Sequence, residues 1–361
     1  MPLKLAELPE PGELTSLEEM SLETFLECLK RHAMAAIAII TRKESLRELN
    51  SSSVMDDSVL EELRRSMDAR RGSAILKNPQ DRFHALLMEF RDVVCDKPPQ
   101  CLPPDRGIRH EIDLVPGTKN CVTRQWPLPR EQVEAIDEFF AAKHRAGMVR
   151  ESKSPHSTPT FCVRKPNGKW RIVHAYNKLN AATIPAQTPI PRKDVLKDNM
   201  ARSTIFSALD LVDGYYQILM RDADIPLTAV STPSGMLWEW LVMPQGLSNA
   251  PATFNRLVTH LFRPMRKYAQ TYFDDIFVHS RAEGDKSDVD VHLEHLRNVL
   301  SCMRKHKLYA NIDKCLFGAE EIPFLGCFIG KQGIRVDPGK VKAIVDWPTP
   351  KSQKDLISGL A

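Results

Sequence analysis

No two of the eight cysteines form a Cys-x-x-Cys pair; they stand at positions 28, 95, 101, 121, 162, 302, 315 and 327. Zinc ribbons and zinc knuckles bind their metal through such pairs, and small secreted domains use cysteines as a disulfide framework. The spacing therefore argues against both classes of protein. We expect most of these cysteines to be reduced and to serve as small, buried apolar side chains.

Long apolar runs and a secretory signal are also lacking. The longest notable apolar run, residues 33–40, has eight residues, whereas a helix that crosses a bilayer needs about 20. The first residues do not show the charged-then-apolar order of a signal peptide. With 16 glycines against 26 prolines, the chain favours long extended connections over a tight repeat. We expect a soluble, intracellular protein.

The residues that are present have an ordinary globular composition. Of 361 residues, 42% are hydrophobic and 27% are charged, which allows two or three modest domains or one large domain of several lobes. The net charge of +4 is compatible with a polyanionic partner. It does not identify one, because local patches of charge decide such binding.

Residues 1–78 differ from the rest of the chain. Helical spacing is visible at residues 17–29 and 59–67, and an arginine-rich stretch ends at Gly72. The segment has no catalytic pattern and no Asp-Thr-Gly or Asp-Ser-Gly signature of an aspartic protease. It is predicted to be a linker or arm of unknown role, and a tail without a specific role is the alternative.

After this segment, strand-like and helix-like patterns alternate. A short strand is predicted at residues 110–115, followed by a helix that ends at Gly147 and whose apolar face is formed by Val133, Ile136, Phe139 and Phe140. Residues 160–173 predict a hairpin, because Asn167-Gly168 is a strong turn signal between two segments rich in β-branched and aromatic residues.

The second half of the chain continues this alternation. A buried strand is predicted at residues 203–211, and Asn249 is predicted to cap a helix with apolar positions Phe254, Leu257, Val258 and Leu261. A strand, a tight turn and a strand follow at residues 268–280, then an amphipathic helix, then a second hairpin at residues 324–334. Helices packed against a small antiparallel sheet make the fold class α+β.

Three aspartates suggest the chemistry. Asp210 ends an otherwise apolar strand, and Asp274 and Asp275 lie at a hairpin turn between apolar segments. A carboxylate at the end of a buried strand is costly unless a positive charge neutralises it, and two at one turn repel each other. Mg²⁺ suits such a cluster, because it prefers carboxylate oxygens and takes its remaining ligands from water and phosphates.

Nucleotidyl transfer by two metal ions needs this arrangement. Because side chains alternate between the two faces of a strand, Asp274 and Asp275 are predicted to have unequal roles, with Asp210 and Asp274 bridging both ions. An isolated Asp-Asp pair is more often a solvated turn. The pair alone therefore does not establish a metal site.

The aspartates belong to a longer series of segments. In chain order these are DLVPGTK (113–119), SPHSTPTFCVRKPNGKWRIV (154–173), LN (179–180), TPIPR (188–192), FSALDLVDGYYQI (206–218), PLTAVSTPSG (226–235), MPQGLSNAPATFNRL (243–257), YFDDIFVHS (272–280), EHLRNVL (294–300), KCLFG (314–318) and FLGCFI (324–329). From about residue 81 onwards, this order resembles the reverse transcriptases of gypsy-like long-terminal-repeat retrotransposons.

The resemblance implies a right-hand polymerase fold, with fingers, a palm that contains an antiparallel sheet, and a truncated thumb. We accordingly expect an N-terminal arm (1–78), an N-terminal extension with the fingers (79–200), a palm with a primer-grip hairpin (201–330) and the start of the thumb or connection (331–361). The implied activity is RNA-directed DNA polymerisation, which adds dNTPs to a primer 3′ end with two Mg²⁺ ions or with Mn²⁺.

The resemblance also implies roles for individual residues. Asp210, Asp274 and Asp275 match the metal-binding catalytic aspartates, and the carbonyl of Leu211 matches a further metal ligand. The positions that match the dNTP-binding residues are Lys165, Arg171, Asp213, Gly214, Tyr215 and Gln245, with Tyr215 excluding a 2′-hydroxyl by its bulk. The positions that match the primer grip are Phe324, Leu325 and Gly326.

Implied partners are an RNA or DNA template with its primer, dNTPs, and the RNase H and integrase domains of a parent polyprotein, of which this chain would be a fragment. No membrane partner is expected, and the implied location is cytoplasmic, which can include virus-like particles. The sequence departs from the family where Ala175 and Asn177 replace the usual aspartate and arginine. This departure puts in question whether the geometry of the fingers and the affinity for nucleotide follow the family.

Two other functions compete with an active polymerase. One is an inactive retroelement remnant that acts at most as a nucleic-acid-binding domain, which the shortened thumb favours. The other is a host polymerase of the telomerase or intron-encoded kind, which the gypsy-like spacing across residues 206–329 disfavours. The three intact aspartates favour an active reverse transcriptase.

Overall fold

A computed structural model describes residues 57–165, 168–187, 191–337 and 339, all within one compact unit that spans residues 55–361. The helix predicted at residues 17–29 lies outside the described residues. The division of the chain into an arm, fingers, palm and thumb stays a prediction.

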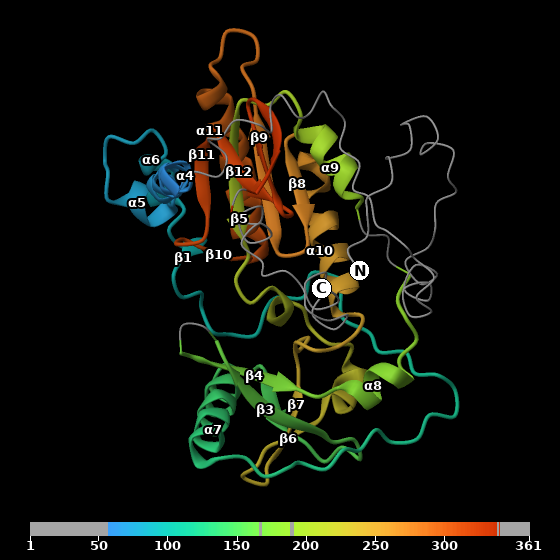
Figure 1. Ribbon diagram of the computed structural model, residues 1–361. Coiled ribbons are helices and arrows are strands. Elements are labelled where there is room, and N and C mark those ends of the chain that lie inside the picture. Colours follow the sequence, from blue (N-terminus) through green and yellow to red (C-terminus); the bar gives the residue numbers. More distant parts are fainter. Residues whose placement is uncertain (1–56, 166–167, 188–190, 338, 340–361) are drawn as a thin grey trace, which may run out of the picture. The chain divides into compact units, whose positions relative to one another are not determined.

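The centre of the unit is a four-stranded antiparallel sheet, here called the palm sheet (Figure 1). In spatial order its strands are β11 (Leu316–Ala319), β5 (Ile205–Asp210), β9 (Asp275–Ser280) and β8 (Ala269–Tyr272). Both faces of the sheet are covered. For this reason β5 and β9 are buried along almost their whole length instead of alternating between buried and exposed positions.

Two helices, α10 (Ala250–Phe262) and α11 (Asp288–His306), pack on one face of the palm sheet (Figure 1). The apolar positions predicted for α10 are all buried. The start of α11 is fixed by Ser287, whose hydroxyl accepts a hydrogen bond from the Asp290 amide. On the opposite face, Phe206 and Phe277 pack with α9 (Lys193–Met200) and with Phe324.

A second sheet, here called the fingers sheet, has five strands. Their order is β2 (Val149–Glu151), β7 (Leu237–Trp240), β6 (Val230–Ser231), β3 (Thr158–Arg164) and β4 (Trp170–His174). The β3–β4 pair confirms the predicted hairpin. Helix α7 (Arg130–Arg145) packs on this sheet through Ile136 and Phe140, and Gly147, with φ of +70°, follows its end as predicted (Figure 1).

A third sheet corrects one prediction. Strands β12 (Glu321–Phe324), β13 (Cys327–Gly330) and β14 (Gly333–Val336) form two successive hairpins. The β13–β14 hairpin confirms the turn predicted around residues 331–333, whereas the β12–β13 hairpin divides the single first strand expected from residue 324. The missed turn is Leu325-Gly326, where both residues have positive φ, +47° and +91°. Leucine rarely adopts this conformation, so the sequence gives little sign of the turn.

The remaining elements connect these sheets. They are α4 (Asp57–Ala69), α5 (Gly72–Leu76), α6 (His84–Glu89), β1 (Val94–Cys95), α8 (Asn177–Ala182), β10 (Ala310–Asn311) and the 3-10 helices η2 (Gly214–Gln217), η3 (Asp222–Thr228) and η4 (Arg263–Met265). Helix α4 confirms the helix predicted at residues 59–67. Strands β1 and β10 pair in parallel.

Two local predictions were wrong. Residues 110–115 form no strand and make only two isolated bridges, His110 with Met220 and Leu114 with Thr183. Asn249 does not cap α10 with its side chain. Its amide instead accepts a hydrogen bond from the Ala186 amide and donates one to the Ile184 carbonyl, 3.0 and 2.8 Å away, so it joins two loops.

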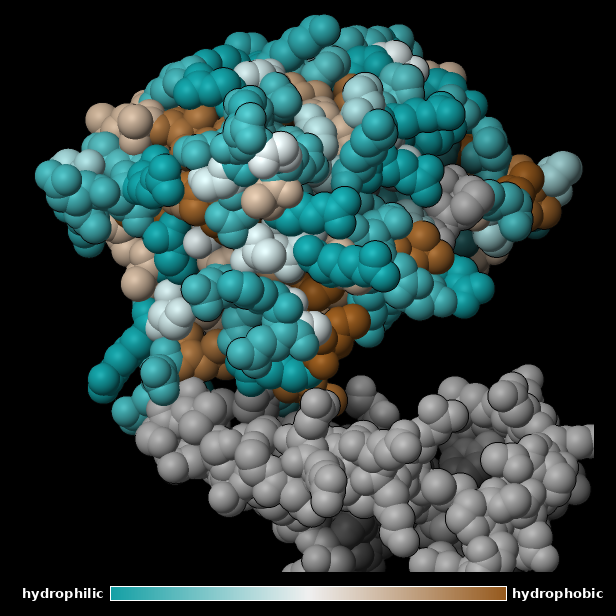
Figure 2. Space-filling model, turned by 90° about the horizontal axis from the view of Figure 1, so that it is seen from above, coloured by the Kyte–Doolittle hydropathy of each residue, from teal (hydrophilic) through white to brown (hydrophobic). Residues whose placement is uncertain are grey.

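Antiparallel sheets with helices on their faces confirm the predicted α+β class. The view from above shows a mainly hydrophilic surface on which hydrophobic side chains form small groups (Figure 2). Within the described ranges, no helix combines the length and the apolar character that crossing a membrane requires.

Helix α11 contacts the palm sheet partly through a buried histidine. The ring nitrogens of His292 lie 2.7 Å from the Ser207 hydroxyl on β5 and 2.8 Å from the Ser280 hydroxyl on β9. A neutral ring donates at one nitrogen and accepts at the other, which the two hydroxyls can match. Burial, reinforced by neighbouring positive groups, lowers the pKa of His292 from 6.5 to about 3.

His292 should therefore destabilise the fold in acid. In the folded state it stays neutral down to about pH 3, whereas in the unfolded chain it binds a proton below about pH 6.5. Each pH unit below 6.5 should then cost about 1.4 kcal/mol of unfolding free energy. In urea unfolding between pH 7 and 5, His292→Gln should show a shallower pH dependence than the wild type. Parallel curves would contradict the assignment.

Candidate active site

The end of β5 and the β8–β9 turn lie next to each other. Asp210 and Asp275 are paired residues of adjacent antiparallel strands, and the Leu211 amide donates a 2.9 Å hydrogen bond to the Asp274 carbonyl. Phe273, with φ of +49°, reverses the chain at the turn. Three carboxylates that are far apart in sequence thus gather at one end of the palm sheet.

Strand alternation decides where two of them point. Asp210 shares a face of β5 with Phe206 and Ala208, and its partner Asp275 lies on the same face of β9. This is the face that packs against Phe324. Asp274 belongs to the turn itself, which matches the expectation that the two neighbouring aspartates are not equivalent.

The cluster carries more negative than positive charge. Desolvation, followed by the charge of Asp210, raises the pKa of Asp274 even though its side chain reaches solvent. Desolvation and then the charges of Asp210 and Asp274 raise the pKa of Asp275 to about 6. The nearby cation is Lys314, whose Nζ lies 3.2 and 3.3 Å from the Asp210 carboxylate oxygens.

This donor set fits a divalent cation of the Mg²⁺ kind. Hard oxygen ligands, mutual repulsion and partial burial all favour a bound cation. No group of three acidic, histidine or cysteine side chains in the described part of the chain is already arranged around one point. Mg²⁺ does not require such a cage, because it keeps waters and binds substrate phosphates.

The predicted pocket floor lies against the carboxylates. Asp213, with φ of +50°, precedes η2, which begins at Gly214. A Cβ added to Gly214 would lie 2.6 Å from the Phe254 ring and 3.1 Å from Asp274 Oδ1. The ring of Tyr215 meets Phe254 edge-on, with centroids 5.5 Å apart. Desolvation and then the charge of Asp274 raise the pKa of Tyr215.

The other predicted residues are more dispersed. Lys165 and Arg171 are exposed on the β3–β4 hairpin, and no contact joins them to the aspartates. Gln245 is exposed in the loop between β7 and α10. Phe324 is buried against Phe277, with ring centroids 4.7 Å apart, and the Leu325-Gly326 turn follows it.

The residues that depart from the family follow the β3–β4 hairpin directly. Strands β3 and β4 pair without a register shift from Thr160–His174 to Arg164–Trp170. The amide of Ala175 then bonds to the Pro159 carbonyl at 3.1 Å. Ala175 and Asn177 themselves lie just after these paired strands, and Asn177 begins α8.

Two residues near the carboxylates were not assigned a role from sequence. Lys314 holds Asp210, and the neighbouring Cys315 is fully buried with its sulfur 3.4 Å from the Asp210 amide. Both belong to the KCLFG segment. Lys314 lies 104 residues after Asp210 in the chain. Only the pairing of β11 with β5 brings them to the site.

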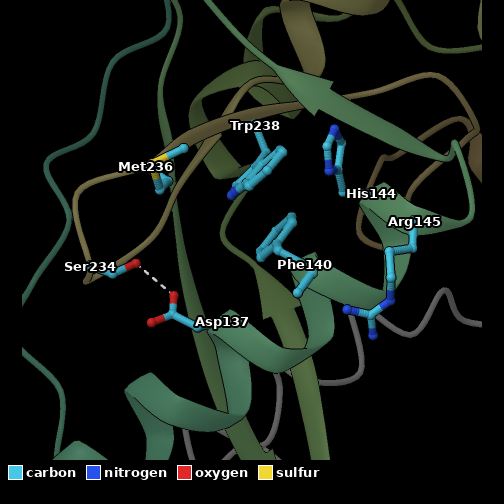
Figure 3. A pocket seen from close by; sticks show the side chains of 8 residues that line it. Asp137, Phe140, His144, Arg145, Ser234, Met236 and Trp238 are labelled. Carbon is cyan, nitrogen blue, oxygen red and sulfur yellow. Dashed lines mark hydrogen bonds between the residues drawn. The ribbon is translucent and has the colours of Figure 1, made fainter.

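A surface hollow of about 440 Å³ lies elsewhere, on the fingers sheet. Figure 3 shows Phe140, His144 and Trp238 around it, with Ser234 bonded to Asp137 at 2.6 Å. None of the predicted site residues lines it. The hollow is therefore separate from the carboxylate cluster.

The segment that carries the carboxylate cluster matches a known family. Residues 163–329 match the family model described as "Reverse transcriptase (RNA-dependent DNA polymerase)". This range contains β5, the β8–β9 turn, η2 and the β12–β13 turn.

More particularly, the chain is similar to retrotransposon polyproteins, which confirms the gypsy-like resemblance. It is 36% identical to a retrovirus-related Pol polyprotein from transposon 297 of Drosophila melanogaster, over 76% of this chain and 26% of that protein. It is 30% identical to the transposon Tf2-3 polyprotein of Schizosaccharomyces pombe, over 94% and 24%. The chain thus spans about a quarter of these relatives.

Solved structures confirm the right-hand polymerase fold. A foamy viral protease-reverse transcriptase in complex with double-stranded DNA matches with a TM-score of 0.69 and 21% identity, over 83% of this chain and 51% of that chain. The foamy viral enzyme in complex with an RNA/DNA hybrid matches with a TM-score of 0.68 and 20% identity, over 83% and 39%.

Gly214→Ala tests the contact between the pocket floor and the cluster. Because the added methyl would collide with Phe254 and press on Asp274, we expect primer extension to fall by about 10- to 100-fold. Overpacking should cost about 1–3 kcal/mol of unfolding free energy. Extension assays paired with thermal unfolding separate the two effects. Wild-type extension rates would show that the turn has room to move.

Proposed function

We propose that this chain is the polymerase portion of a reverse transcriptase and adds dNTPs to a primer 3′ end on an RNA or DNA template. The observation that carries this proposal is the meeting of Asp210 with the 274–275 turn, directly beside Gly214. The match of residues 163–329 to the family supports it.

Asp210, Asp274 and Asp275, with the carbonyl of Leu211, are the groups that would hold two Mg²⁺ ions, or Mn²⁺ with the same ligand preference. Bound ions supply acidity for the attacking hydroxyl and neutralise the charge of the triphosphate and the departing pyrophosphate. The ammonium of Lys314 lies 3.2 Å from a carboxylate oxygen of Asp210 and forms an ion pair with it.

The remaining residues position the substrates. Lys165 and Arg171 are free to bind triphosphate oxygens, because the exposed β3–β4 hairpin gives them no carboxylate partner within the described ranges. Tyr215 excludes a 2′-hydroxyl by its bulk. Gln245 lies near the base and the 3′-hydroxyl.

The Leu325-Gly326 turn, anchored by buried Phe324, holds the primer end. Rate enhancement comes mainly from positioning and charge neutralisation.

The partners follow from this activity. A template with its primer and dNTPs bind here, and RNase H and integrase domains accompany the polymerase in the parent polyprotein. Relatives that are about four times longer than the matched segment are consistent with such a polyprotein. A cytoplasmic location, which can include virus-like particles, stays a prediction.

Asp274→Asn tests the metal assignment. Removing one charge while keeping the shape should lower Mg²⁺- or Mn²⁺-dependent primer extension on an RNA template by about 10³-fold. Asp285→Asn is the matched control, because Asp285 is exposed on a loop away from the cluster. Equal extension by wild type and Asp274→Asn would overturn the proposal. Template binding without extension by the wild type would instead favour a nucleic-acid-binding remnant.

A further inference from the structure

Lys143, on helix α7, is a buried cation without a carboxylate partner. Its side chain is 7% exposed, and Nζ contacts the Gln100 amide oxygen at 3.2 Å and the Met148 sulfur at 3.7 Å. No ion pair involves it within the described ranges. Burial lowers the pKa of Lys143, and the charge of Asp213 partly opposes this. A buried charge is costly unless neighbouring groups pair with it or accept its hydrogen bonds.

Besides the Gln100 hydrogen bond, Lys143 also contacts an aromatic ring. Nζ lies 4.3 Å from the centroid of Tyr216, within the range of a cation–π interaction. Tyr216 also stacks nearly parallel on Trp240, with centroids 5.1 Å apart. The ring of Tyr216 thus contacts a cation from helix α7 and an indole from strand β7.

Tyr216 belongs to the turn that forms the pocket floor. It follows Tyr215 directly in η2, and Asp213 and Gly214 precede them. The palm side of the turn is held separately. Arg106 donates hydrogen bonds to the carbonyls of Gln217 and His306, so it ties the end of η2 to the end of α11.

The fingers side of η2 depends on Lys143 and Trp240. Trp240 is fully buried and its stacked ring fixes the plane of Tyr216. Stacking on the indole still allows the ring of Tyr216 to slide within its own plane. It therefore does not by itself fix the position of η2. The Lys143 ammonium adds that constraint, since its attraction is strongest over the ring centre.

We propose that Lys143 is a positioning residue for the nucleotide pocket. Its ammonium, in contact with the ring of Tyr216, sets the placement of Tyr215. In this way it couples helix α7 to the pocket floor. This inference rests on the proposed function, because it assigns Lys143 to the pocket in which Tyr215 meets the sugar. Loss of the ammonium lets Tyr215 shift, and with it the side of the pocket that excludes a 2′-hydroxyl. The positions of the carboxylates do not change.

Lys143→Met is the informative variant. Methionine keeps the length and apolar volume and removes the charge, so thermal stability should be unchanged or higher. The KM for dNTPs should rise about 3- to 10-fold with little change in kcat, and discrimination against ribonucleotides should fall by a similar factor. Lys143→Arg should restore part of both effects, because a guanidinium also binds over an aromatic ring.

The control is Lys153→Met, the same chemical change at an exposed position before β3. Binding of dNTP to the protein on a dideoxy-terminated primer, measured with Ca²⁺ in place of Mg²⁺, gives a second readout that needs no turnover. If the wild-type protein extends primers and Lys143→Met has the same KM for dNTPs, the same ribonucleotide discrimination and the same dNTP binding, the inference is overturned. The proposed function would still stand. Failure of wild-type extension and binding would overturn both.

Discussion

Repulsion among three carboxylates is the constraint on which the rest of the structure depends. Asp210 and Asp275 are paired on one face of the palm sheet, and Asp274 lies in the adjoining turn. Burial and like charges raise the pKa values of Asp274 and Asp275, so folding alone does not relieve the conflict. A sheet covered on both faces supplies the rigidity that keeps the groups together.

Packing on both faces holds in place the end of the palm sheet that carries the carboxylates. On one face α10 and α11 are fixed by Phe254, Leu296 and the His292 hydrogen bonds, and on the other Phe277 packs against Phe324. Gly214 allows the pocket floor to approach Asp274 without a side chain in between. The packing of the hydrophobic core therefore determines where the charged side chains of the cluster lie.

Much of the fold and of the cluster could be predicted from sequence. The strands around Asp210 and the 274–275 turn were recognisable because apolar runs flank each acidic residue. The failures had local causes. Leu325 adopts a left-handed conformation that leucine rarely takes, and the Asn249 side chain bonds to a loop instead of to its own helix.

Residues whose role depends on distant neighbours could not be found in this way. Lys314 meets Asp210 through the pairing of β11 with β5. Lys143 occupies a buried position of the amphipathic helix α7, although lysine is rarely buried. Its contacts with Gln100 and with the ring of Tyr216, 73 positions along the chain, account for that burial.

Strand β11 is the outer strand of the palm sheet, and the segment before residue 79 closes its open side. The Phe317 amide bonds to the Arg70 carbonyl, the Arg70 side chain bonds to the Phe317 carbonyl, and the Gly72 amide bonds to the Cys315 carbonyl. A protein trimmed to begin at residue 79 would present these main-chain groups to its neighbours. Such trimming invites self-association through strand addition, although it removes nothing from the catalytic centre.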